Sequence, residues 1–341
     1  MDAVILFLGP AGFPYVLSRP QTGTTQDGLW QVTANLQQVL HDGRFLSGLS
    51  CAGGLNELHV CAVDWDGILV HVMRDNTGAW SPYDDVRRLI SRRKHSVCSP
   101  VPVATACATD SSGQLHLCMV DSRGGLFHTI RTASGTWPFP LGDVRQQIVG
   151  NGHPSIGPVK TVACAVNDVD ELHVLALDGA GTLWQTMRLA NGTWPFAFFD
   201  VQANLHPVGG IGPLSSIACA NDANNLHVCA VDVQTSRLWH TIRDSSGNWP
   251  FPFGDVQNQA GTVAGSTAGA GAAPIVSTAC AASSARLHVL AIANDPRFGR
   301  ILGYTIRESG GTWQAFGNIT QQANLPHGGF VDPTQCSTTS G

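Results

Sequence analysis

The chain has 341 residues, of which 13% are charged, and its formal net charge is −5. This low and negative charge excludes a general nucleic-acid-binding surface. No apolar run has the length of a membrane-spanning helix, so we expect no membrane insertion. Glycine is abundant, with 38 residues, as a fold with many tight turns requires.

The N-terminal residues 3–9 are apolar, but no basic segment precedes them. We therefore predict that they form a β-strand and not a signal peptide, in a protein that is cytoplasmic or released by a non-classical route. Residues 15–19, which end in Arg19, predict the next strand.

Residues 226–249 show the unit from which the chain is built, and this unit predicts three short strands. One apolar run ends at Asp232, a second ends at Arg243, and a turn of the form Arg-x-x-x-Gly-x-Trp leads to Trp249. Glycine accepts positive φ in such a turn, and Asp and Ser bond the nearby backbone. The unit recurs along the chain.

Five copies are continuous in the sequence. Their second strand begins with Leu-His, at His59, His116, His173, His227 and His288. A strand of small residues precedes each Leu-His pair and carries one cysteine, namely Cys51, Cys107, Cys164, Cys219 or Cys280. These cysteines lie about 55 to 61 residues apart, a spacing that indicates a propeller or another repeat array.

The two ends of the chain supply a sixth copy. The N-terminal copy lacks its own cysteine strand, and residues 334–337 around Cys336 supply one. A linear array would need polar caps at both ends, whereas a last segment that completes the first repeat closes a ring. We therefore predict an all-β fold, a six-bladed β-propeller of four-stranded antiparallel blades, closed by the C-terminal strand joining the N-terminal blade.

The whole chain, 1–341, is predicted to be one domain. Blade 1 spans 3–40 plus 332–341, and the others span 45–86, 101–144, 159–201, 214–256 and 275–319. Each blade should run from the cysteine strand near the centre to an outer strand that begins at the repeated Trp and ends at Asp-Val. Most of the ten cysteines should be buried and reduced, because six occupy one repeated position and Leu175 and Leu290 replace others.

The histidines repeat with the blades. Those of the Leu-His strands are predicted to be structural, each bonding a backbone or Asp partner between blades, because an unpaired buried polar atom costs roughly 1–3 kcal/mol. His71, His128 and His240 share a position with Gln185 and Tyr304, which argues against metal binding. We expect neither a metal nor a cofactor.

Several aromatic and polar residues are candidates for contacts with a sugar. Trp184, Trp239 and Phe127 share a variable position on the third strand, where an aromatic face beside polar groups would suit a pyranose ring. Arginine offers a fork of hydrogen-bond donors. The predicted sugar-binding residues are Trp184, Trp239, Phe127, Tyr304, His153, His206, Arg188 and Arg243.

The pattern Leu-His-Val…Gly-x-Leu-Trp-His-Thr-Ile-Arg…Gly-x-Trp…Asp-Val, best seen at 226–256 and 115–144, resembles the propeller lectins of the Photorhabdus lectin family and, more loosely, tectonin-type lectins. The likeness covers nearly the whole chain. It implies sites between neighbouring blades for fucose or O-methylated sugars. Those lectins typically have seven blades, whereas six are counted here. The six-bladed fucose lectins of the Aleuria type have less similar motifs.

We predict a multivalent, non-enzymatic lectin whose partners are glycans or glycoconjugates. No nucleophile elbow, metal-type spacing or phosphate loop is present, so no catalytic residue is assigned. Two alternatives stay open. One is a propeller enzyme, such as a cyclase or glycosidase, with a single site at the central channel or on one face, where the basic loop 87–95 is the best candidate. The other is a protein-interaction scaffold, and homo-oligomerisation also stays open.

Overall fold

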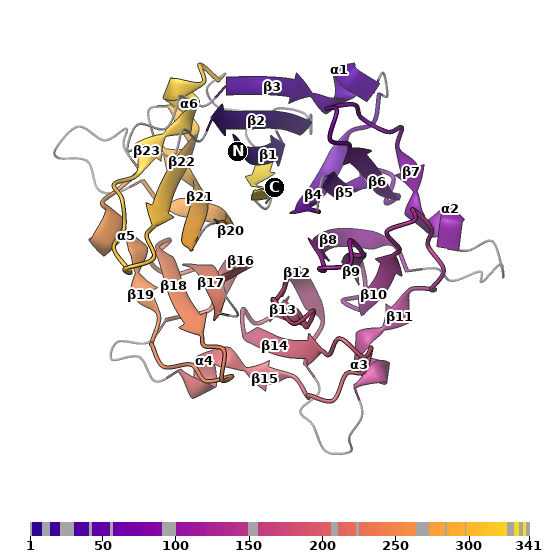
Figure 1. The fold of residues 1–341 in the computed structure, drawn as a ribbon. Coiled ribbons are helices and arrows are strands. Elements are labelled where there is room, and N and C mark those ends of the chain that lie inside the picture. Colours follow the sequence, from indigo (N-terminus) through magenta and orange to yellow (C-terminus); the bar gives the residue numbers. More distant parts are fainter. Residues whose placement is uncertain are drawn as a thin grey trace.

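The computed structural model describes residues 2–8, 14–20, 31–40, 43–54, 57–90, 100–148, 156–205, 211–222, 225–263, 273–283, 285–296, 298–325, 331–333 and 337–338. Six antiparallel sheets stand around a central axis (Figure 1). This arrangement confirms the predicted six-bladed β-propeller.

Blades 2 to 6 are meanders of four strands that run from the axis outward. Blade 2 has β4 (Leu46–Gly53), β5 (Leu58–Asp64), β6 (Leu69–Arg74) and β7 (Asp84–Asp85). Blade 3 has β8 (Pro102–Thr109), β9 (Leu115–Asp121), β10 (Leu126–Arg131) and β11 (Gly142–Asp143). Blade 4 has β12 (Val159–Val166), β13 (Leu172–Asp178), β14 (Leu183–Arg188) and β15 (Phe199–Asp200). Blade 5 has β16 (Leu214–Asp222), β17 (Asn225–Asp232), β18 (Leu238–Arg243) and β19 (Gly254–Asp255), and blade 6 has β20 (Ile275–Ser283), β21 (Arg286–Asp295), β22 (Gly299–Arg307) and β23 (Gly317–Asn318).

Blade 1 joins the two ends of the chain, as predicted. Its N-terminal part is β1 (Asp2–Leu8), β2 (Pro14–Pro20) and β3 (Gln31–Asn35). Two short C-terminal strands, β24 (Val331–Pro333) and β25 (Ser337–Thr338), both pair with β1. The innermost position is therefore filled by two short segments in place of one strand. Cys336, which carried the prediction, lies outside the described residues.

The repeated Asp-Val does not end a long outer strand, which corrects the expectation for this segment. The outer strands of blades 2 to 6 have two residues each, and β3 of blade 1 has five. A short helix follows each outer strand: α1 (Leu36–Leu40), α2 (Val86–Ile90), α3 (Val144–Gln147), α4 (Val201–Asn204), α5 (Val256–Ala260) and α6 (Ile319–Gln322). Asp143, Asp200 and Asp255 are N-caps, since their carboxylates accept hydrogen bonds from backbone N–H groups of the first turn. The valine that follows each Asp is fully buried and anchors the helix.

The hydrophobic core lies between the blades, at the interface of each neighbouring pair, which we call a seam. Six clusters of buried apolar side chains are found among the described residues, one at each seam. Eight cysteines of the described segments are buried and free, as expected. Cys61 of blade 2 and Cys107 of blade 3, for example, share one seam cluster. None of the helices described is long and apolar enough to cross a membrane.

The turn Arg-x-x-x-Gly-x-Trp needs its glycine. Gly247 has a φ of +89°, a conformation that residues with a Cβ rarely adopt. A Cβ built on Gly247 would lie 2.9 Å from Nη2 of Arg243, because the arginine folds back over its own turn. The glycine thus allows the guanidinium to lie close to the backbone at the edge of the seam.

Candidate functional site

In blades 2 to 6, the histidine of the Leu-His strand is hydrogen-bonded to a polar side chain of the next strand. Nδ1 of the strand histidine lies 3.0 to 3.1 Å from Nε2 of a second histidine in the pairs His59–His71, His116–His128 and His227–His240. In blade 4 Gln185 bonds His173, and in blade 6 the Tyr304 hydroxyl bonds His288. The structural role predicted for these histidines is thus supported. Their bonding partner, however, lies in the same blade and not across the seam, because the two strands are hydrogen-bonded neighbours.

The next blade supplies an arginine and a tryptophan to this pair. The ring of Trp194 contacts His128 edge-on, with the ring centroids 5.6 Å apart. Burial, followed by the charge of Arg131, lowers the pKa of His59 to about 4. Burial and then Arg243 lower the pKa of His173 to about 4 as well. His59 and His173 are therefore neutral at pH 7, and the positive charge beside each of them is that of the arginine.

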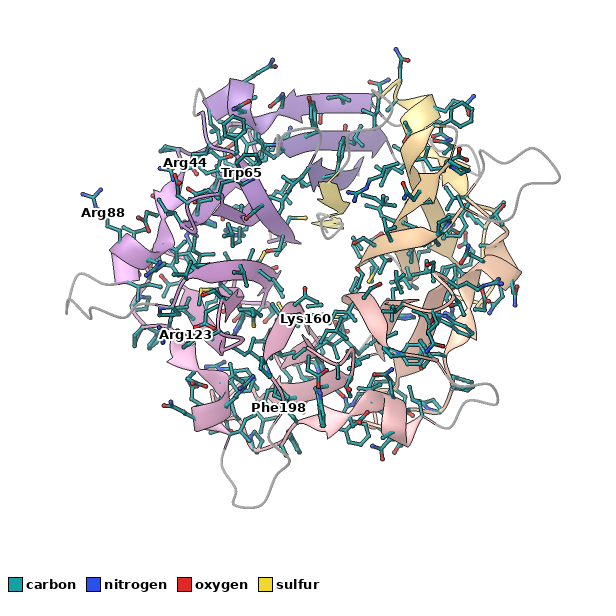
Figure 2. All side chains as sticks on the ribbon, turned by 180° about the vertical axis from the view of Figure 1, so that it is seen from behind. Arg44, Trp65, Arg88, Arg123, Lys160 and Phe198 are labelled. Atoms are coloured by element: carbon teal, nitrogen blue, oxygen red, sulfur yellow. The ribbon has the colours of Figure 1, made fainter. Side chains whose placement is uncertain are left out.

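A pocket opens at the seam between blades 4 and 5. Its volume is about 280 Å³. Gln185, Phe196 and Phe199 of blade 4 line one side, and Arg243 and Trp249 of blade 5 line the other. Figure 2 shows Phe198, a further lining residue, in the outer part of blade 4. The pocket combines apolar aromatic walls with one guanidinium and one amide, a composition typical of small-ligand sites.

An equivalent pocket of about 240 Å³ lies at the seam between blades 3 and 4. His128 replaces Gln185, Phe139 replaces Phe196, and Arg188 of blade 4 takes the place of Arg243. A third pocket of about 140 Å³ in blade 6 is lined by Tyr304, Thr305 and Gln314 among others. Because the propeller repeats its strands, the same construction returns at the seam between blades 3 and 4 and at the seam between blades 4 and 5.

A phenylalanine that the sequence prediction missed lines each of the two seam pockets, Phe139 in one and Phe196 in the other, and Phe251 has the equivalent position in blade 5. Phe139, Phe196 and Phe251 follow the repeated tryptophan by two residues and are 52%, 48% and 58% exposed. The hydroxyl of a strand threonine fixes each one by donating to its carbonyl oxygen, at 2.9, 2.8 and 2.8 Å, from Thr129, Thr186 and Thr241 respectively. The signal in the sequence is Trp-Pro-Phe, which occurs in blades 3, 4 and 5.

The predicted sugar-binding residues divide into three groups. Arg188 and Arg243 line seam pockets, and Tyr304 lines the pocket in blade 6. Trp184, Trp239 and Phe127 are partly buried and pack against the seam clusters. There the indole N–H of Trp184 donates to Asp178 at 2.9 Å. His153 and His206 lie outside the described residues. The structure thus brings the arginines to the seam pockets, whereas the three strand aromatics pack against the seam clusters and line neither of these pockets.

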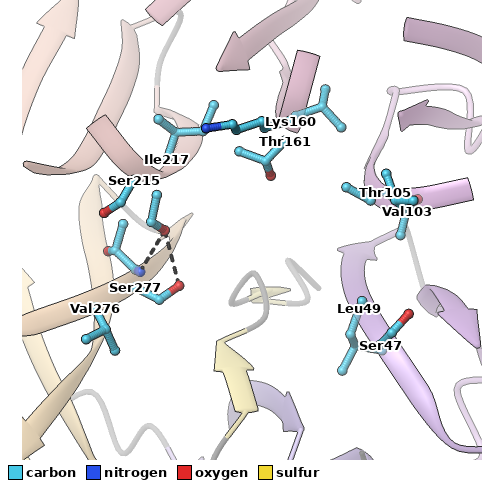
Figure 3. Close-up of a pocket in the computed structure, with 15 residues that line it drawn as sticks. Ser47, Leu49, Val103, Thr105, Lys160, Thr161, Ser215, Ile217, Val276 and Ser277 are labelled. Carbon is cyan, nitrogen blue, oxygen red and sulfur yellow. Dashed lines mark hydrogen bonds between the residues drawn. The ribbon is translucent and has the colours of Figure 1, made fainter. Parts of the chain in front are cut away.

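A separate pocket of about 280 Å³ lies at one mouth of the central channel (Figure 3). The first residues of β4, β8, β12, β16 and β20 line it, and Lys160 is their one charged residue. In the part of the chain that the structure describes, no three His, Cys, Asp or Glu side chains are grouped to hold a metal ion. Of the basic loop 87–95, Arg87 and Arg88 lie on α2, and residues 91–95 are outside the described residues.

The fold and the seams define the chain as a six-bladed β-propeller with repeated pockets between its blades. No protein-family model and no curated protein matches the sequence. Among solved structures, the BP39L lectin from Burkholderia pseudomallei is similar, with 18% identity, a TM-score of 0.52, and coverage of 91% of this chain and 82% of that one. A fungal lectin from Aleuria aurantia, described as a six-bladed β-propeller with a novel fucose recognition mode, has 15% identity, a TM-score of 0.51 and coverage of 85% and 84%.

One similar solved structure is that of an enzyme. A GH43 glycoside hydrolase engineered for endo-xylanase and exo-arabinofuranosidase activity has 11% identity and a TM-score of 0.51, with coverage of 84% of this chain and 54% of the hydrolase. At these identities the comparisons establish the fold alone. The function must therefore be argued from the pockets.

Proposed function

We propose that the protein is a multivalent lectin that binds fucose or O-methylated sugars in its seam pockets. The observation that carries the proposal is the repetition of one pocket, with an exposed phenylalanine on one blade and an arginine on the next. Pyranose rings present C–H groups that pack on aromatic faces, and their hydroxyls accept hydrogen bonds from guanidinium donors. Fold similarity to lectins and the likeness to the Photorhabdus lectin motifs support the choice of sugar.

Three equivalent sites per chain are expected. The seams between blades 3 and 4, 4 and 5, and 5 and 6 each have the phenylalanine of the Trp-Pro-Phe motif and an arginine of the next blade, namely Arg188, Arg243 or Arg307. Blades 2 and 6 have Ser81 and Gln314 after the tryptophan and lack this phenylalanine. Each site should be weak alone, with a Kd of roughly tens of μM to mM, and avidity on a glycan surface should strengthen binding.

Calorimetry with methyl α-fucoside and with O-methylated monosaccharides tests the proposal. We expect a stoichiometry near three, falling to two in Phe196→Ala. Phe298→Ala is a matched control, because Phe298 is also an exposed phenylalanine but lies on the β21–β22 turn. Binding that is equal in Phe196→Ala and the wild type would refute the pocket assignment.

We also infer that the protein acts by binding and not by catalysis. The polar residues of the seams recur from blade to blade, whereas a catalytic site needs different residues that converge on one place. Incubation with nitrophenyl glycosides, including xylosides and arabinofuranosides, should release no nitrophenol. Turnover that is lost in a Lys160 variant would favour an enzyme with its site at the central channel.

A further inference from the structure

The five strands that line the channel mouth share one irregularity in their pairing. Each strand has a β-bulge at its second residue, where the pairing register with the next strand shifts. A bulge leaves one residue unpaired and turns its side chain to a new direction. The five bulged residues are Ser47, Val103, Lys160, Ser215 and Val276, and all of them line the pocket (Figure 3).

Lys160 gives this pocket its charge. The chain has two lysines, Lys94 and Lys160, and Lys160 lies at the channel mouth. Within the described part of the chain, Lys160 has neither an ion pair nor a side-chain hydrogen bond. The carboxylate at the neighbouring register position, Asp178, already accepts hydrogen bonds from the N–H groups of Ala180, Thr182 and Trp184. None of the described residues therefore occupies the ammonium group, which leaves it available to a ligand.

The hydroxyl groups around Lys160 present acceptors. Ser47 donates its proton to the carbonyl oxygen of Val63 at 3.2 Å, and Ser215 donates to that of Val231 at 3.3 Å. Lone pairs on these oxygens remain to accept hydrogen bonds from a ligand. The pocket thus offers hydroxyl acceptors and one cationic donor, with Val103 and Val276 as apolar surface.

We propose that the channel mouth binds one carboxylate-bearing monosaccharide per chain, of the uronic acid type. The carboxylate would pair with the Lys160 ammonium group, the sugar hydroxyls would donate to Ser47 and Ser215, and the apolar side of the ring would contact the valines. A volume of about 280 Å³ is near the lower end of ligand pockets and suits a single sugar ring. This site is separate from the seam pockets and does not depend on their function.

The two lysines allow a direct test on the intact protein. Reductive ¹³C-methylation keeps the charge of each amine and gives separate NMR signals for Lys94, Lys160 and the N-terminus. Titration with glucuronate should shift the Lys160 signal and leave that of Lys94 unchanged. Glucose, which lacks the carboxylate, and acetate, which lacks the hydroxyls, should each bind at least about tenfold more weakly.

Two pairs of variants separate this site from the others. Lys160→Met should weaken glucuronate binding by roughly tenfold or more, and Lys94→Met should not change it. Phe196→Ala, which removes a seam pocket, should also leave glucuronate binding unchanged, so that failure of the seam proposal is distinguished from failure of this one. Glucuronate binding that survives Lys160→Met, or acetate binding as tight as that of glucuronate, would overturn the inference.

Discussion

Trp194 meets His128 edge-on across the seam between blades 3 and 4, with the ring planes at 78°. The same contact joins Trp137 to His71 at the seam between blades 2 and 3, and Trp313 to His240 at the seam between blades 5 and 6. Each histidine is also bonded to a second imidazole of its own blade. The repeated tryptophan is therefore a seam residue that covers a buried imidazole pair, and this arrangement makes the stability of the propeller sensitive to protonation.

Stability should fall as the solution is acidified. Burial and then the arginine of the next blade lower the pKa of His59, His173 and His227 from 6.5 to about 4. Between these values the unfolded chain binds more protons than the folded one, so stability is full above about pH 6.5 and is lost as the pH falls toward 4. Thermal melts from pH 7.5 to 4.5 should show a progressive decrease in Tm.

A matched variant is available for this pH test. His128→Gln imports the residue that blade 4 already has at this position, since Gln185 bonds His173. The variant should fold and should lose less stability on acidification than the wild type, because one buried imidazole no longer titrates. A Tm that stays constant from pH 7.5 to 4.5 in the wild type would contradict the proposed origin of the pH dependence.

Removal of the C-terminal strands should open the ring. Deletion of residues 331–341 exposes the edge of β1, which β24 and β25 cover in the structure. Unpaired strand edges favour aggregation, so we expect light scattering to increase and Tm to fall by on the order of 10 °C. The control is deletion of 339–341 alone, which leaves both strands in place. Equal Tm and solubility in the two truncations would disprove closure by these strands.

The buried thiols should be unreactive until the protein unfolds. Burial raises the pKa of Cys61 and Cys219, which keeps them protonated, and the thiolate is the reactive form. Thiol titration of the native protein should therefore leave the eight buried cysteines unmodified. After denaturation without reductant, nearly all ten cysteines of the chain should react. Finding half or more of the ten oxidised would show that disulfides staple the protein.

Trp239→Ala and Phe251→Ala should have opposite effects on stability and binding. Trp239 packs against the cluster of the seam between blades 4 and 5, so its removal should lower the free energy of unfolding by about 2–3 kcal/mol. Phe251 is mostly exposed, and its removal should change stability by less than about 0.5 kcal/mol while abolishing one sugar site. Denaturant unfolding and sugar titration of both variants measure the two effects.

The opposite result for Trp239→Ala and Phe251→Ala would assign the sugar contact to the strand aromatics. Loss of one sugar site in Trp239→Ala with unchanged stability would show that the strand aromatics contact the sugar. The phenylalanine of the Trp-Pro-Phe motif would then be excluded as the main contact if Phe251→Ala bound normally.

The repeat could be predicted from the sequence because it depends on local patterns. The cysteine of each inner strand, such as Cys219, and the Leu-His pair that follows it recur at a nearly constant spacing, and the number of copies gives the number of blades. The role of Asp255 also depends on its local sequence, but an Asp followed by an apolar residue fits the end of a strand as well as the N-cap of a helix. In the structure Asp255 is an N-cap, because its carboxylate accepts a hydrogen bond from the N–H of Asn258.

The pockets depended on tertiary structure. Neighbouring residues of a strand, such as Trp184 and Gln185, point to opposite faces of the blade, and the sequence does not say which face is covered by packing and which opens into a pocket. That choice depends on how the Arg243 turn of blade 5 lies relative to Phe196 of blade 4, since these two residues are 47 positions apart and line the same pocket. The period of the sequence determined the six blades and their closure. The docking of adjacent sheets decided where their surfaces leave room for a ligand, because a cavity is a property of two packed surfaces and not of one strand.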